Sequence, residues 1–190
     1  MARTWHTDLR DLLEGGGPTP LAARVRERFT CALVQAATAR APGDPRPTAV
    51  RCVTRVDDRA CAEWVHAVRD GDTIVWSCPG CADNGFVTHF VKSPYDLSAL
   101  GAPSDAARRS WILEEEQHRL LMAEEDTPRA IEVVLASAAP LDDARLQVEA
   151  TPEELARVYA HVRALMDLAP GGPRDEALEE ILTSLDAALG

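Results

Sequence analysis

The cysteines are the residues of this chain whose spacing most directly suggests chemistry. Eight residues separate Cys52 from Cys61, and only two separate Cys78 from Cys81. A Cys-Pro-Gly-Cys turn can direct two thiolates toward one tetrahedral metal ion, and the wider pair can complete a four-sulfur shell. We therefore predict that Cys52, Cys61, Cys78 and Cys81 bind one structural zinc ion, whose binding energy is part of the folding energy of this segment.

Two other interpretations of these cysteines remain open from the sequence. They can be packed free thiols, because reduced cysteine is often a small buried residue. Cys78 and Cys81 can also form the redox pair of a thiol-disulfide oxidoreductase, whose first thiol normally lies at a helix N-terminus. The sequence that follows, Ala82-Asp83-Asn84-Gly85, predicts a turn instead of a helix, and Cys52 and Cys61 would have no role.

Several other polar residues have simpler interpretations. Cys31 lies in a predicted helix, where we expect it in the core. His66 and His89 fall on predicted strands near the knuckle, and we leave both outside the metal site. Glu114, Glu115 and Glu116 point in different directions around a helix, so we interpret them as a solvated helix start that complements the helix dipole.

The charge is uneven along the 190 residues and limits the classes of partner. Residues 1–100 hold 12 basic and 12 acidic side chains, whereas residues 101–190 hold 8 and 19, so the second half carries the whole net charge of −11. Nucleic-acid binding normally needs a basic surface, which argues against it here. No apolar run is long enough to span a bilayer, and residues 1–8 lack a signal-peptide pattern, so we expect a cytoplasmic protein without a membrane-spanning segment.

Helical and strand patterns divide the first half of the chain. Apolar spacing predicts one helix from Trp5 to Leu13, ended by the glycines at 15–17, and a second helix that Thr19 caps and that continues to about residue 40. Beyond a proline-rich connector at 41–47, we predict strands at 62–68, 73–76 and 86–91, with turns at 70–72 and 83–85. Three short strands bury little apolar surface, which is why a metal is expected here.

The second half combines helices with one strand pair. We predict a helix from Glu114 to Glu124 after Trp111-Ile112-Leu113, and antiparallel strands at 131–135 and 144–148. Thr151-Pro152-Glu153-Glu154 predicts a capping box at the start of a helix. A last helix is predicted beyond the glycine-proline break at 170–173.

The chain as a whole is therefore predicted to be an α+β protein. We expect an N-terminal helical segment at 1–41 and a small three-stranded zinc-ribbon-like unit at 48–100. An acidic part with a strand pair and two or three helices is expected at 105–190, either separate or sharing one core with the ribbon.

The cysteine region also resembles a family of small bacterial zinc-ribbon-like proteins without an assigned activity. The matching stretches are Trp5 to Arg10, the Cys52/Cys61 pair, Ile74 to Cys81, Asp83 to Gly85, Ser93 to Leu97 and Thr151 to Leu155. The resemblance implies a metal site and no particular reaction. The family's knuckle reads Cys-x-x-Cys-Gly, whereas Ala82 stands here; a left-handed alanine costs about 1 kcal/mol, far less than the roughly 10–16 kcal/mol of structural zinc binding.

Three functions follow as hypotheses. The first is a non-enzymatic protein-interaction or regulatory module, with Trp64, Phe86 or Tyr95 as candidates for its docking surface, because four cysteines leave no metal position open for chemistry. The second is a nucleic-acid-binding ribbon using arginines such as Arg51, Arg55 and Arg59, although nearby acidic residues offset them. The third is the thiol-disulfide oxidoreductase.

Overall fold

The computed structural model describes residues 2–14, 20–57, 59–100, 107–124, 126–168 and 173–190. It confirms the α+β class and divides the chain into two compact units, unit 1 at 1–102 and unit 2 at 103–190. The break predicted at 15–17, residues 170–172 of the break predicted at 170–173, and the cap predicted at Thr19 lie outside the described residues. Within those residues, no helix is long and apolar enough to cross a membrane.

Unit 1 is built on a five-stranded sheet in the order β1-β7-β6-β5-β2. The strands are β1 (Thr4–Asp8), β2 (Arg46–Arg51), β5 (Trp64–Asp70), β6 (Thr73–Ser77) and β7 (Asn84–Thr88). Only the β1–β7 pair is parallel. The sheet therefore contains β1 and β2 in addition to the three expected strands.

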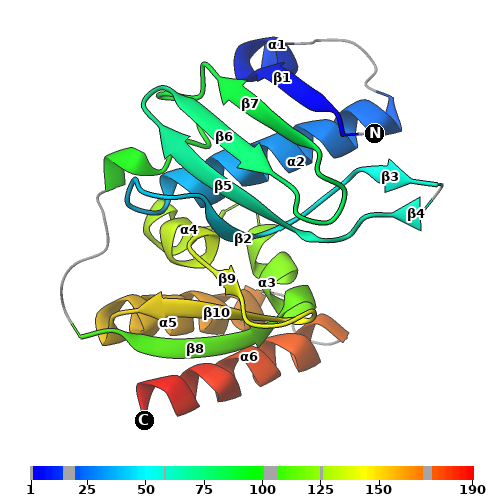
Figure 1. Ribbon diagram of the computed structural model, residues 1–190. Helices are drawn as coiled ribbons and strands as arrows, with labels where there is room; N and C mark the ends of the chain where they lie inside the picture. The colour runs from blue at the N-terminus through cyan, green and yellow to red at the C-terminus, as the bar shows by residue number, and fades with distance from the viewer. Residues whose placement is uncertain (1, 15–19, 58, 101–106, 125, 169–172) are drawn as a thin grey trace. The chain divides into compact units, whose positions relative to one another are not determined.

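One face of this sheet is covered by helix α2 (Leu21–Thr38), which lies across the strands in Figure 1. The helix buries its C-terminal half, while Leu21 and Val25 in its first half are exposed. Phe29 meets the ring of Trp76 edge-on, with centroids 5.2 Å apart. Cys31, Cys52 and Cys78 belong to the same buried cluster, so the hydrophobic core continues to the cysteine turns.

Two corrections concern the edges of unit 1. The helix predicted from Trp5 begins only at Leu9, as α1 (Leu9–Glu14), because residues 4–8 pair with β7 along their whole length. The turn predicted at Asp83 to Gly85 is also wrong in part, since Asn84 and Gly85 already belong to β7. In both cases pairing between distant segments overrides the local pattern.

A short hairpin of β3 (Arg55–Val56) and β4 (Arg59–Ala60) extends from the sheet (Figure 1). After β7 the chain turns through the Ser93 to Leu97 segment and the short 3-10 helix η1 (Ser98–Leu100). There the Asp96 carboxylate accepts hydrogen bonds from the Lys92 amide and from Ser98. This segment is fixed to α2, because the Thr38 hydroxyl accepts a 3.0 Å hydrogen bond from the Leu97 amide.

The described residues of unit 2 form a three-stranded antiparallel sheet and four helices. Its strands are β8 (Arg109–Glu114), β9 (Ala139–Pro140) and β10 (Arg145–Ala150), in the order β8-β10-β9. Its helices are α3 (Glu115–Met122), α4 (Arg129–Ala136), α5 (Pro152–Leu168) and α6 (Pro173–Leu189). The capping box predicted at Thr151 is present: the Thr151 amide donates to Glu154 Oε2 at 2.8 Å, and the Glu154 amide donates to Thr151 Oγ1 at 3.2 Å.

The strand predicted at 131–135 is wrong, because these residues form α4. Ile131, Val134 and Leu135 are buried at helical spacing, and Arg129 pairs with Glu132 one turn later at 2.9 Å. The β-branched run favoured a strand, but packing of one helical face decided the structure. The strand predicted to pair with residues 131–135 is present as β10, but it pairs with β8 and β9. Strand β8 contains Trp111 to Leu113, which were predicted to lead directly into a helix.

Candidate metal centre

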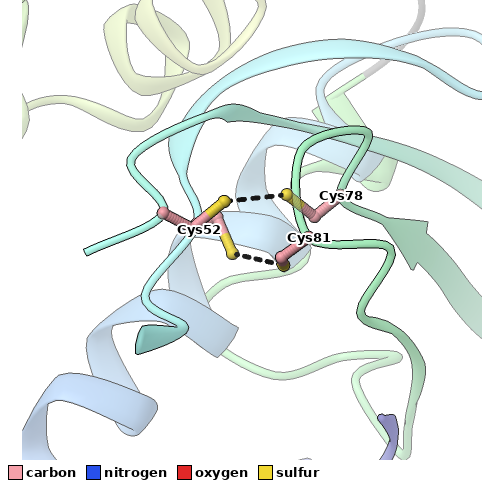
Figure 2. Close-up of side chains that lie close together, drawn as sticks. Cys52, Cys78 and Cys81 are labelled. Atoms are coloured by element: carbon pink, nitrogen blue, oxygen red, sulfur yellow. Dashed lines mark hydrogen bonds between the residues drawn. The ribbon is translucent and has the colours of Figure 1, made fainter. Parts of the chain in front are cut away.

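The structure brings the four cysteine sulfurs of the two pairs together at one end of the unit 1 sheet. All four Sγ atoms lie within 4.8 Å of one another. The sulfurs of Cys52 and Cys81 are 3.7 Å apart (Figure 2). Those of Cys61 and Cys78 are 3.5 Å apart, so each close pair joins the two turns. Sulfurs bound at about 2.3 Å to one tetrahedral ion would be about 3.8 Å apart, so the cluster can hold a metal ion.

The first turn is placed by β2 and β5. Cys52 directly follows β2, and Cys61 lies between β4 and β5. Two backbone hydrogen bonds of 2.8 Å close the loop, from the Cys52 amide to Glu63 O and from the Cys61 amide to Thr54 O. Ala62, the residue after Cys61, has a φ of 54°, which turns the chain back into the sheet.

The second turn repeats this geometry between β6 and β7. The Cys78 amide donates to Asp83 O at 2.7 Å, and the Ala82 amide donates to Cys78 O at 3.0 Å. Ala82 has a φ of 61°, so the position after the second cysteine is left-handed, as the missing glycine suggested. Both turns therefore place an alanine in a conformation that costs about 1–2 kcal/mol.

Gly80 allows the two turns to approach each other. A Cβ atom on Gly80 would lie 2.3 Å from Glu63 Cγ and 3.2 Å from Cys61 Sγ. The first contact is closer than real carbon atoms allow, so a side chain here would force the Glu63 side chain to shift and would crowd the Cys61 sulfur. The glycine inside Cys-Pro-Gly-Cys is thus explained by packing between the turns.

Backbone amides are directed at the sulfurs. Burial raises the pKa of Cys52 and of Cys78, while amide hydrogen bonds from Thr54 to Cys52 and from Cys81 and Gly80 to Cys78 act in the opposite direction. Burial also acts to raise the pKa of Cys81, but the Asp83 amide and the neighbouring thiols outweigh it, and that pKa is lowered. Amide donors favour the thiolate form, and a bound cation would offset the desolvation that opposes it.

Asp83 is a buried carboxylate beside the second turn, and its side chain is 1% exposed. Its oxygens accept hydrogen bonds from the Arg3 amide at 2.9 Å, the Trp5 indole at 3.2 Å and the Thr54 hydroxyl at 2.8 Å. Burial acts to raise the pKa of Asp83, but these donors and the Arg3 guanidinium lower it. Sequence reasoning missed this role, because a buried aspartate and a turn aspartate look alike in a linear pattern.

Solvent reaches two of the four cysteines in part. Cys52 and Cys78 are buried, whereas Cys61 and Cys81 are half-buried. A groove of about 600 Å³, lined in part by Arg3, Thr54, Arg55 and Gly80, reaches Cys81. Small molecules such as chelators can therefore approach Cys81 from this groove.

The remaining candidate residues lie elsewhere. Cys31 is 6% exposed, and burial raises its pKa to about 11, as expected for a core thiol. Among the described residues, the only group of three or more metal-ligating side chains is the four cysteines, so neither His66 nor His89 joins them. Nδ1 of His89 lies 2.7 Å from the Asp8 carboxylate instead.

Two features bear on the other interpretations. Cys81 is followed by left-handed Ala82 and then by β7, so the Cys-Pro-Gly-Cys turn does not begin a helix, as a redox motif would.

Glu115 and Glu116 form the first turn of α3, and the Gln117 side chain accepts a hydrogen bond from the Glu114 amide at 3.0 Å. The acidic run is thus a helix start.

Comparison with known proteins adds no assignment. No family model, curated protein or solved structure matches the chain. The resemblance to zinc-ribbon-like proteins accordingly stays a prediction, and any functional conclusion has to rest on the cysteine cluster.

Proposed function

We propose that Cys52, Cys61, Cys78 and Cys81 bind one zinc ion that is structural, and that unit 1 serves as a protein-interaction or regulatory module in the cytoplasm. The convergence of four sulfurs from two turns, within 4.8 Å of one another, carries this proposal. Four thiolates satisfy tetrahedral zinc and leave no position for a substrate or an activated water. The metal would then stabilise the fold instead of taking part in a reaction.

The ligand atoms and their spacing support a metal that prefers sulfur, such as zinc. The ligand atoms are all sulfur, the close sulfur pairs match tetrahedral spacing, and amides from both turns are directed at the sulfurs. A four-thiolate tetrahedral site favours zinc or iron over the harder ions that prefer oxygen ligands. An iron-loaded protein would be coloured, so absorbance distinguishes the two metals.

The three aromatic residues suggested for a docking surface differ in how accessible they are. Trp64 is only 8% exposed, and the Arg51 guanidinium stacks on its ring at 3.4 Å, so this indole is not a free docking group. Phe86 and Tyr95 are half-buried. Phe86 lies with His6 on the sheet, with ring centroids 5.3 Å apart, and is the better candidate for a contact with another protein.

Metal analysis of the full chain tests the zinc assignment. Protein purified without chelator should contain about one zinc per chain by mass spectrometry, and Cys78→Ser should lose the zinc together with stability. Cys31→Ser is the matched control, because Cys31 is a buried thiol outside the cluster and should leave the zinc content unchanged. Wild-type protein without zinc, when freshly reduced and supplied with the ion, would overturn the assignment.

The interaction role needs a separate experiment. Cross-linking of the tagged full chain in its native cells should recover one reproducible partner through unit 1, and Cys78→Ser should lose it. Salt-sensitive binding of DNA or RNA by the pure protein would favour the nucleic-acid alternative, and reduction of insulin would favour the oxidoreductase. No reproducible partner for the wild-type protein would contradict the proposal.

A further inference from the structure

The Asp83 carboxylate connects the second cysteine turn to two segments that are distant in the sequence. Oδ1 accepts from the Arg3 amide of the N-terminal segment at 2.9 Å. Oδ2 accepts from the Trp5 indole in β1 at 3.2 Å and from the Thr54 hydroxyl in the first cysteine turn at 2.8 Å, and it pairs with the Arg3 guanidinium at 3.3 Å. One buried anion thus holds the N-terminal strand to both halves of the cysteine cluster.

The main chain of Asp83 is held in turn by the second cysteine turn. The Asp83 amide is a hydrogen-bond donor to Cys81, and the Asp83 carbonyl accepts from the Cys78 amide at 2.7 Å. Thr54 is held in the same way by the first turn, where its carbonyl accepts from the Cys61 amide at 2.8 Å. The position of the carboxylate therefore depends on the two turns staying together, which is what a shared metal ion enforces.

Strand β1 is an edge strand of five residues whose one strand partner among the described residues is β7. Its second half is also held by other elements: the Arg26 guanidinium of α2 donates to His6 O at 3.4 Å and to Thr7 Oγ1 at 3.2 Å, and Nδ1 of His89 lies 2.7 Å from the Asp8 carboxylate. Arg26 also lies over the Trp5 ring at 5.3 Å.

Trp5 packs closely over Gly85, where a Cβ atom would lie 2.5 Å from the Trp5 carbonyl oxygen. The Asn84 amide also donates to Arg3 O at 3.0 Å. Both contacts come from residues immediately beyond Asp83, so they too depend on the shape of the second turn.

From these contacts we infer that metal binding at the four cysteines and docking of β1 are thermodynamically coupled through Asp83, an inference that rests on the proposed metal site. When the metal leaves, the two turns separate, the carboxylate loses its fixed position and the pairing of β1 with β7 opens more readily, because Arg26 and His89 then hold the strand without Asp83. The edge of β7 then exposes unpaired backbone groups, which are the groups that an extended strand recognises. The metal thus controls whether this edge is covered.

Hydrogen exchange of the full chain tests the inference. Zinc-loaded and chelator-treated protein, both kept reduced, are compared by mass spectrometry after metal content has been measured. We expect at least tenfold faster exchange of residues 4–8 on metal removal and less than twofold change in the β5–β6 hairpin and in β10 of unit 2. Unchanged exchange at 4–8, or equal loss of protection throughout unit 1, would overturn the coupling.

Coupling between two sites is reciprocal, which provides a second test. Trp5→Ala weakens the docking of β1 and should lower zinc affinity about tenfold in competition with a chromophoric chelator. Thr4→Ala is the matched control, because this exposed side chain of the same strand should leave zinc affinity unchanged. Equal zinc affinities for Trp5→Ala and wild type would contradict the inference.

The Asp83→Asn variant separates the inference from the proposed function. At saturating zinc it should bind one ion per chain and yet show the fast exchange at residues 4–8 that wild type shows only without metal. Slow exchange in this variant would overturn the role of Asp83 and leave the zinc site standing. A wild-type protein that binds no zinc would overturn both proposals, and the metal analysis reports that outcome separately.

Discussion

Replacement of Asp83 by asparagine tests how much one buried carboxylate contributes to the stability of unit 1. Asparagine keeps one acceptor oxygen and replaces the other with an amide donor. In one orientation the new amide faces the Trp5 indole and the Arg3 guanidinium, and in the other it faces the Arg3 amide. Thr54 can rotate its hydroxyl to accept a hydrogen bond, but the nitrogen donors cannot, so either orientation leaves a donor facing a donor.

The magnitude follows from the contacts that are lost. A hydrogen bond to a charged group contributes about 1.5–3 kcal/mol. The Arg3 side chain is 55% exposed, so solvent screens its ion pair with Asp83 and limits this contact to about 0–1 kcal/mol. We therefore expect Asp83→Asn to lower the free energy of unfolding of unit 1 by about 2–4 kcal/mol.

Urea unfolding of zinc-saturated, reduced protein measures this loss. Unfolding is followed by tryptophan fluorescence. Three of the four tryptophans lie in unit 1, and a Trp111→Phe background removes the fluorescence of unit 2. Asp72→Asn is the matched control, because Asp72 lies in the exposed β5–β6 turn and should change stability by less than about 0.5 kcal/mol. If both variants unfold at the wild-type urea midpoint, the carboxylate network does not stabilise unit 1 and the reasoning is refuted.

Three further predictions address single positions. Ala82→Gly relieves about 1–2 kcal/mol of left-handed backbone strain. The added backbone entropy of the unfolded chain costs about 0.5–1 kcal/mol, so the urea midpoint of unit 1 should rise slightly. A lower midpoint would contradict the strain at Ala82. Gly85→Ala places a Cβ atom 2.5 Å from the Trp5 carbonyl oxygen and should cost at least about 1–3 kcal/mol in the same assay; unchanged stability would show that β1 can shift freely. His118 is buried, its Nε2 lies 2.9 Å from Leu135 O, and desolvation lowers its pKa. Below about pH 6.5 this imidazole is therefore protonated in the unfolded state but stays neutral in the folded state. As the pH drops further, the free energy of unfolding of unit 2 falls by up to about 1.4 kcal/mol per pH unit. His118→Gln should flatten this dependence, and equal pH profiles for the variant and wild type would exclude His118 as the cause.

Much of the local structure could be predicted because it depends on short-range chemistry. The β5–β6 hairpin follows from alternating apolar residues around Asp70-Gly71-Asp72, and Gly71 has the positive φ that its turn requires. The start of α5 follows from the Thr151/Glu154 capping box. In each case the residues that decide the structure lie within a few positions of one another, so a linear pattern contains the information.

The errors fall where distant segments decide. Residues 4–8 become a strand because β7 offers them an open parallel edge, and residues 131–135 become helical because one face packs in the core of unit 2. Neither β7 nor that core can be located from the residues themselves. The same limit hid Asp83, whose donors come from residues 3, 5 and 54.

By itself the sequence determined the chemistry available to this protein: four thiols in two turns, an acidic second half and an α+β pattern of elements. Only the tertiary structure decided that the two turns meet with their sulfurs within 4.8 Å, and that a buried carboxylate connects them to the N-terminal strand. The physical reason is that residue type and spacing fix which groups can bind a metal. Their convergence depends on sheet pairing and core packing between segments that are far apart along the chain.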